Sequence, residues 1–228
     1  MMKRFIALLL GIALVFGTVS VPAMAAGAFV DVPANAWYNA SVSYAIGERL
    51  FFGVDQTHFA PNSQMTRAML VAVLWRHAGR PIEKGNVEFL DVPEGAWYAD
   101  AVSWASANSI VHGNVAPSET ADGNDIYYGE FYPNRAITRQ ELAAVLARYA
   151  RYIGLPVSGN GTAALSQFPD ARNIADWALQ DMQWCVENGY ISGSRTSNGT
   201  YLYARYPATR AQVATVLMRF CLSLDKII

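Results

Sequence analysis

An apolar stripe with helical spacing occurs three times along the chain. In each copy an apolar residue lies five positions after a tryptophan, and a small residue lies eight positions after it. Positions three apart, extended to four by Ile46 and Val186, share one face of a helix. The pattern predicts three similar helices, each followed by a turn at a glycine 16 residues beyond its tryptophan. The stripes are Val42 and Ala45, Val102 and Ala105, and Met182 and Cys185; the glycines are Gly53, Gly113 and Gly193.

A second helix is predicted after each turn, opening at a Thr-Arg pair. Threonine is a favourable N-cap, and a Glu or Gln three residues later completes a capping box. Thr138 with Glu141 and Thr209 with Gln212 fit this motif, whereas the first copy has Met69 at the last position. The apolar stripes that follow are Leu70, Val73 and Leu74; Leu142, Val145 and Leu146; and Val213, Val216 and Leu217.

Each copy also begins with a similar loop, Phe-x-Asp followed by the tryptophan. The loops start at Phe29, Phe89 and Phe168, so three repeats of one supersecondary unit account for the chain. We expect repeat one at 26–80, repeat two at 86–151 and repeat three at 165–228, within one structural unit at 26–228. The segments between glycine and Thr-Arg differ in length, and Asp122-Gly123 and Asn198-Gly199 predict surface hairpin turns there.

The first 25 residues have the features of a secretory signal peptide. Lys3 and Arg4 precede an apolar run from Phe5 to Phe16, and Ala23-Met24-Ala25 is a small-x-small cleavage pattern. The run is short for a membrane span. We expect residues 1–25 to be cleaved; the alternative is an uncleaved anchor.

The charge balance argues against general attraction to polyanions. The chain has 17 Lys and Arg against 18 Asp and Glu, and loss of Lys3 and Arg4 leaves a net charge of about −3. Nucleic acid is therefore not an expected partner. An acidic ligand must meet a local cluster of positive groups.

The motifs together resemble the S-layer homology family: F-x-D, a tryptophan, a helix, a glycine turn, F-x-P, and I-T-R-A-E opening a second helix. Repeat two matches best, with Phe131, Pro133 and Ile137 in place; repeat three has Leu202-Tyr203-Ala204 in place of F-x-P and an extra residue between Asp170 and Trp177. The resemblance implies a mainly α, pseudo-threefold trimer of helix-loop-helix repeats. It also implies a central bundle of the first helices, with the second helices as prongs and short hairpin insertions.

The resemblance further implies that grooves between prongs bind the secondary cell-wall polymer of Gram-positive bacteria, often through a pyruvylated amino sugar. Arg67, Arg139 and Arg210 are the first candidates for its carboxylate, because guanidinium pairs with carboxylate in two parallel hydrogen bonds. Each lies at a helix N-terminus, where free N–H groups favour anions and a cation opposes the helix dipole. The alternative is a strut from each arginine to an aspartate of a neighbouring repeat.

The other candidate ligand-binding residues have structural alternatives. Aspartates of the Phe-x-Asp loops would mainly cap the first helix or its loop, and contact a sugar hydroxyl second. The tryptophans would stack on a sugar face or pack between repeats, and we expect Trp97 to be mostly buried. The turn glycines would supply positive φ or close approach. These candidates are Asp31, Asp91, Asp170, Trp37, Trp97, Trp177, Gly53, Gly113 and Gly193.

Nothing in the sequence supports catalysis. His58, His77 and His112 occupy unrelated positions in the repeats, so no shared base or metal site is expected, and no cofactor motif is present. Cys185 and Cys221 replace alanines of the other repeats, which favours small core residues, with a disulfide as the alternative.

The leading hypothesis is a secreted, monomeric, non-catalytic module that binds a wall polysaccharide at the cell surface, with no membrane contact after cleavage. The alternative is an exported protein–protein adaptor on the same scaffold, motivated by Met69 and Gln212. A small wall hydrolase is a third, weaker hypothesis.

Overall fold

A computed structural model describes residues 29–84, 87–115, 127–159 and 163–225. The predicted signal peptide and the Asp122–Gly123 turn lie outside these residues. None of the described helices has the length and apolarity needed to cross a membrane.

Two α-helices form in each repeat, which confirms the prediction of a mainly α fold. The first helices are α1 (Asn39–Gly47), α3 (Ala99–Ala107) and α5 (Asp176–Glu187), and the second helices are α2 (Arg67–His77), α4 (Arg139–Tyr152) and α6 (Arg210–Leu224). The predicted capping boxes are present at Thr138/Glu141 and Thr209/Gln212, and Thr66 caps α2 alone. A short 3-10 helix, Ala171–Asn173, takes up the extra residue of repeat three.

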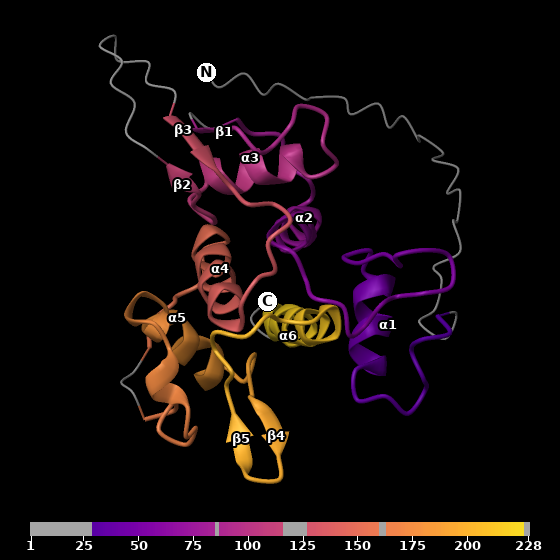
Figure 1. Cartoon of the computed structure of the whole chain (residues 1–228), viewed down its shortest axis with the longest axis vertical. Coiled ribbons are helices and arrows are strands. Elements are labelled where there is room, and N and C mark those ends of the chain that lie inside the picture. The colour runs from indigo at the N-terminus through magenta and orange to yellow at the C-terminus, as the bar shows by residue number, and fades with distance from the viewer. Residues whose placement is uncertain (1–28, 85–86, 116–126, 160–162, 226–228) are drawn as a thin grey trace, which may run out of the picture.

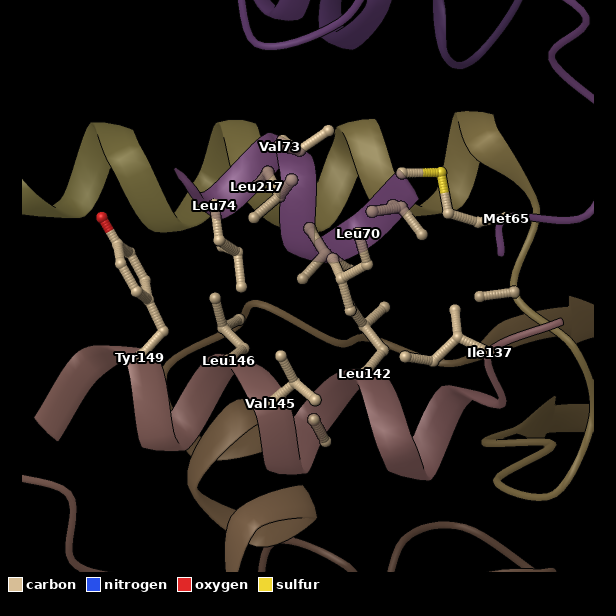
Figure 2. Close-up of a cluster of buried hydrophobic side chains, with 14 of the residues drawn as sticks. Met65, Leu70, Val73, Leu74, Ile137, Leu142, Val145, Leu146, Tyr149 and Leu217 are labelled. Atoms are coloured by element: carbon tan, nitrogen blue, oxygen red, sulfur yellow. The ribbon is translucent and has the colours of Figure 1, made fainter. Parts of the chain in front are cut away.

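The second helices, not the first, form the centre of the molecule. Figure 1 shows α2, α4 and α6 in the middle and α1, α3 and α5 outside them. In Figure 2, Leu70 and Leu74 of α2 meet Leu142 and Leu146 of α4, with Leu217 of α6 behind them. The expectation that the first helices form the central bundle is therefore wrong. The second helices bury residues on several faces, whereas α1 and α3 bury only four residues each.

Each first helix packs on the second helix of the repeat before it. α3 contacts α2, α5 contacts α4, and α1 contacts α6, which closes the ring between the first and last repeats. The buried stripes predicted from the sequence make these contacts: Val42 and Ala45, Val102 and Ala105, and Met182 and Cys185 are all at most 1% exposed.

A ring of backbone hydrogen bonds joins the three repeats just before the second helices. The N–H of Met65 donates to the carbonyl of Ala208 at 2.9 Å, Ala208 to Ile137 at 2.8 Å, and Ile137 back to Met65 at 2.8 Å. The side chains of these three residues are at most 1% exposed. Their polar backbone groups are thus satisfied by one another inside the core, which fixes the repeats as one unit.

Short strands lie in the loops of repeats two and three. β1 (Val87–Phe89) pairs in parallel with β3 (Tyr127–Glu130), and β2 (Asn114–Val115) pairs antiparallel with β3. In repeat three, β4 (Ser194–Thr196) and β5 (Gly199–Tyr201) form a hairpin, as Asn198-Gly199 predicts.

Candidate ligand grooves between the repeats

The Thr-Arg arginines are buried and join neighbouring repeats. Arg67 donates from Nε to the carbonyl of Phe131 at 2.9 Å, Arg139 to that of Leu202 at 2.6 Å, and Arg210 to that of Phe59 at 2.8 Å. Each arginine thus reaches the loop of the next repeat around the ring, at 6–9% exposure. Burial lowers the pKa of all three. The strut alternative describes this geometry, with a backbone carbonyl in place of the expected aspartate.

The first N–H groups of the second helices are occupied by protein acceptors. In α4, the N–H of Arg139 donates to Tyr206, that of Gln140 donates to Ala204, and that of Glu141 donates to Thr138 Oγ1. α2 and α6 repeat the arrangement with the loops of repeats two and one. These ends therefore do not offer the free donors that the sequence analysis expected for an anion.

The aspartates of the Phe-x-Asp loops hold the same loops, each within its own repeat, from the other side. Asp91 accepts from the N–H groups of Phe131 and Tyr132 at 2.7 and 2.6 Å. Asp31 and Asp170 bind the corresponding pairs, Phe59 with Ala60 and Leu202 with Tyr203. The expected capping of the first helix does not occur, because α1, α3 and α5 have no side-chain cap. Aspartate and arginine instead clasp one loop between them.

The turn glycines are required by close packing. A Cβ at Gly113 would lie 2.7 Å from the carbonyl oxygen of Glu130 and against the ring of Phe89. Gly53 and Gly193 meet Phe29 and Phe168 in the same way, and Gly193 also has a φ of +74°. Both expected reasons for glycine, close approach and positive φ, therefore occur, the second only at Gly193.

The three tryptophans are exposed at the surface. Trp37, Trp97 and Trp177 are 66%, 60% and 56% exposed, so the expectation that Trp97 is mostly buried is wrong. Trp37 and Trp97 lean edge-on against the adjacent Tyr38 and Tyr98, with ring centroids 5.2 and 5.1 Å apart. An exposed ring held by a neighbouring ring is suited to contact a ligand.

A hollow of about 480 Å³, called groove one here, joins Trp37 of repeat one to α6 and the loop 190–195 of repeat three. Three arginines line it: Arg139 from repeat two, and Arg195 and Arg219 from repeat three. Arg219 donates to the carbonyl of Tyr190 at 3.2 Å and to Ser192 Oγ at 3.1 Å, which holds its guanidinium at the wall. Gly193 lines the same hollow.

Groove two has the same plan with a smaller volume of about 190 Å³. It joins Trp177 of repeat three to α4 of repeat two, and Arg67, Arg148 and His112 line it. Burial and the nearby Arg148 lower the pKa of His112. Glu141 in this wall forms an ion pair with Arg135. Trp37 and Trp177, and likewise Arg219 and Arg148, occupy equivalent positions of the repeats.

The arginine near the end of each second helix is a candidate ligand residue that was not expected from the sequence. Arg76, Arg148 and Arg219 each lie nine residues after the Thr-Arg arginine. Nine residues are two and a half helical turns, so the two arginines of one helix point to opposite sides and serve different grooves. This spacing was visible in the sequence, but its meaning depends on the ring arrangement.

The described residues contain no group of three or more His, Cys, Asp and Glu placed to hold a metal ion. Cys185 and Cys221 are buried and free, so the structure supports small core residues and not a disulfide.

The fold and grooves define a class: a repeat protein that presents exposed tryptophans and arginines in hollows between its repeats. The S-layer homology domain model matches residues 28–68, 88–143 and 167–214, which is more than half of the chain. The chain belongs to the S-layer homology domain family. It is therefore a secreted, cell-wall-associated protein of the cell surface, built as an anchoring module.

The relatives are much longer proteins. The chain is 32% identical over 168 residues to the surface-layer 125 kDa protein of Lysinibacillus sphaericus, covering 74% of this chain and 13% of the relative. It is 26% identical over 217 residues to the S-layer protein sap of Bacillus anthracis, covering 95% and 24%. An amylopullulanase of Thermoanaerobacterium thermosulfurigenes is 28% identical over 189 residues, covering 83% and 9%.

Proposed function

We propose that grooves one and two bind an acidic secondary cell-wall polysaccharide, through a sugar that carries a carboxylate such as pyruvylated N-acetylhexosamine. The observation that supports this most is groove one, where an exposed tryptophan and three arginines face one hollow. Outside such clusters, a protein with a net charge near −3 has no general attraction for an acidic polymer.

Each part of groove one matches one part of such a sugar. The ring of Trp37 offers a flat surface to the apolar face of the sugar. Arg219 and Arg195 offer guanidinium groups that can pair with the carboxylate at two points. Ser192 and Ser194 offer hydroxyls, and Gly193 lets the ligand approach the backbone closely. Arg139 keeps its inter-repeat bond and contributes its positive charge from the floor of the groove.

The relatives support an anchoring role. Two surface-layer proteins and an amylopullulanase match this chain over only 9–24% of their own length. A shared attachment to the wall explains this distribution better than a shared catalytic step. We therefore expect the module itself to release no sugar or peptide from purified walls.

Sedimentation with purified cell walls tests the proposal. The chain without its leader should sediment with walls that keep their secondary polymer, and less with walls stripped of polymer or of pyruvate. Trp37→Ala should weaken sedimentation because it removes the stacking surface. Arg219→Ala should weaken it by roughly tenfold or more in affinity, the range for losing a charge-assisted contact. Arg172→Ala is the matched control, because Arg172 is exposed and lines neither groove. Equal sedimentation with stripped walls would show that the polymer is not the ligand.

A further inference from the structure

A third groove position exists by the repeat symmetry, but its contacts differ from those of the other two. There Trp97 lies two residues before α3, the helix that packs on α2 of repeat one. The equivalent arginines are Arg210 and Arg76. The residue before the turn glycine differs in each repeat: Ser192 in groove one, His112 in groove two and Phe52 at the third position.

The hollow with the larger residue at this position is the smaller of the two. With Ser192 the hollow measures about 480 Å³, and with the larger His112 it measures about 190 Å³. Phenylalanine is larger again and lacks a polar group to offer to a sugar. From these two hollows we expect the third position to be the most filled of the three, with Phe52, which is 53% exposed, covering it at the surface.

Phe52 also engages the arginine that would meet the ligand. The Arg76 Cζ atom lies 4.9 Å from the centroid of the Phe52 ring, so the ring covers the guanidinium face. Arg76 donates to the carbonyl of Leu50 at 2.8 Å, and Arg210 donates to the carbonyl of Phe52 at 2.7 Å. These two carbonyl bonds have counterparts in the other grooves, Arg219 to Tyr190 in groove one and Arg67 to His112 in groove two. The difference is the side chain before the turn glycine: Arg219 contacts the hydroxyl of the small Ser192, whereas Arg76 lies against the ring of Phe52.

We propose that Phe52 closes the third groove, so that the molecule presents two sugar sites from three repeats. The inference rests on the proposed function of grooves one and two. It makes the residue before the turn glycine the determinant of whether a groove binds: the polar Ser192 and His112 leave a hollow, and the apolar ring of Phe52 over Arg76 closes it.

Titration calorimetry with a soluble pyruvylated N-acetylhexosaminide measures the number of sites. The wild-type chain should bind two equivalents and Phe52→Ser, which copies repeat three, should bind three. Phe52→Tyr keeps the ring over Arg76 and should stay at two. Trp37→Ala and Trp177→Ala should each lose one site. Trp97→Ala should lose none in the wild-type chain and should remove the extra site from Phe52→Ser.

The outcomes separate this inference from the proposed function. Three sites in the wild-type chain, or loss of a site in Trp97→Ala, would show that the third groove is open and overturn the inference while grooves one and two stand. No gain in a folded Phe52→Ser would show that something other than Phe52 closes the groove. No binding by any variant would refute the proposed function as well. The Trp97→Ala arm decides the matter even where Phe52→Ser fails to fold.

Discussion

At the scale of single residues, the ends of the first helices show how one backbone position is filled differently in three repeats. Arg49, Ser109 and Gly189 follow their helices with φ of +56°, +56° and +71°. Glycine adopts this left-handed conformation without a steric cost, whereas other residues pay roughly 1 kcal/mol. Only repeat three has the residue that the backbone prefers.

We therefore predict that Arg49→Gly and Ser109→Gly each stabilise the protein by roughly 0.5–1 kcal/mol, because they relieve this cost. Gly189→Ser should destabilise it by a similar amount. Denaturant unfolding of the three variants measures the free energies. A loss of stability in both glycine variants would mean that contacts of the Arg49 and Ser109 side chains outweigh the backbone term.

A second prediction at this scale separates exposed from buried tryptophans. Trp37→Ala should change the free energy of unfolding by only about 0.5 kcal/mol, since most of the ring is in solvent. Trp104→Ala should cost about 3–5 kcal/mol, since its ring is wholly buried in the core. Thermal unfolding and wall sedimentation together check this: the first variant should lose binding and keep stability. If Trp37→Ala were strongly destabilised, Trp37 would have to be assigned to packing between repeats.

At the scale of elements, the loop before each second helix is held by an aspartate of its own repeat and an arginine of the preceding repeat in the ring. For the loop at Phe131, these are Asp91 and Arg67. The residue after Phe131, Tyr132, has a φ of +59°, so the clasp also stabilises a strained backbone. The clasp links the packing within a repeat to the contact between repeats.

Asp91→Ala should accordingly destabilise the fold by about 2–3 kcal/mol, because two N–H groups lose a charged acceptor. Affinity for wall polymer per folded molecule should stay unchanged. Glu94→Ala, at an exposed neighbouring position, is the control. A drop in affinity with normal stability would instead assign Asp91 to the sugar, as the second role considered from the sequence.

Local features of these elements could be predicted from the sequence, because they depend on neighbours along the chain. Thr138 and Glu141 cap α4 as expected, and Asn198-Gly199 turns a hairpin. The central position of α2, α4 and α6 could not be predicted, since both helix sets carry apolar stripes. The hydrogen-bond partners of the arginines could not be predicted either. The acceptor of Arg210 lies 151 residues away, and it is a backbone carbonyl, which every residue has.

At the scale of the whole molecule, the ring closes at both ends of the central bundle. Residues Met65, Ile137 and Ala208 close one end by backbone hydrogen bonds. At the other end the equivalent residues are His77, Tyr149 and Phe220. The His77 and Tyr149 rings lie 5.6 Å apart, and those of Tyr149 and Phe220 lie 6.1 Å apart. The backbone is thus similar in the three repeats, but the side chains at equivalent positions differ in residue type, both in the bundle and in the grooves.

The last prediction concerns the pH dependence of this bundle end. Burial lowers the pKa of His77 despite the opposing charge of Glu48, and Arg76, Asp225, Tyr44 and Cys221 line the same cavity. His77 Nδ1 also pairs with the hydroxyl of Tyr149.

Because the folded pKa of His77 is below that of the unfolded chain, the unfolded state binds more protons as pH falls. The contribution of His77 to stability is therefore complete above about pH 6.5 and is lost as pH falls through that value toward the folded pKa. His112 in groove two, whose pKa is also lowered, acts in the same direction.

The double variant His77→Phe/Tyr149→Phe copies Phe220 at both positions and leaves no hydroxyl unpaired. Between about pH 7.5 and about pH 5, its free energy of unfolding should fall less than that of the wild-type chain. The companion variant His112→Gln measures how much His112 in groove two contributes to the loss of stability on acidification. An equal loss of stability on acidification in wild type and double variant would show that His77 is as easily protonated in the folded bundle as in the unfolded chain.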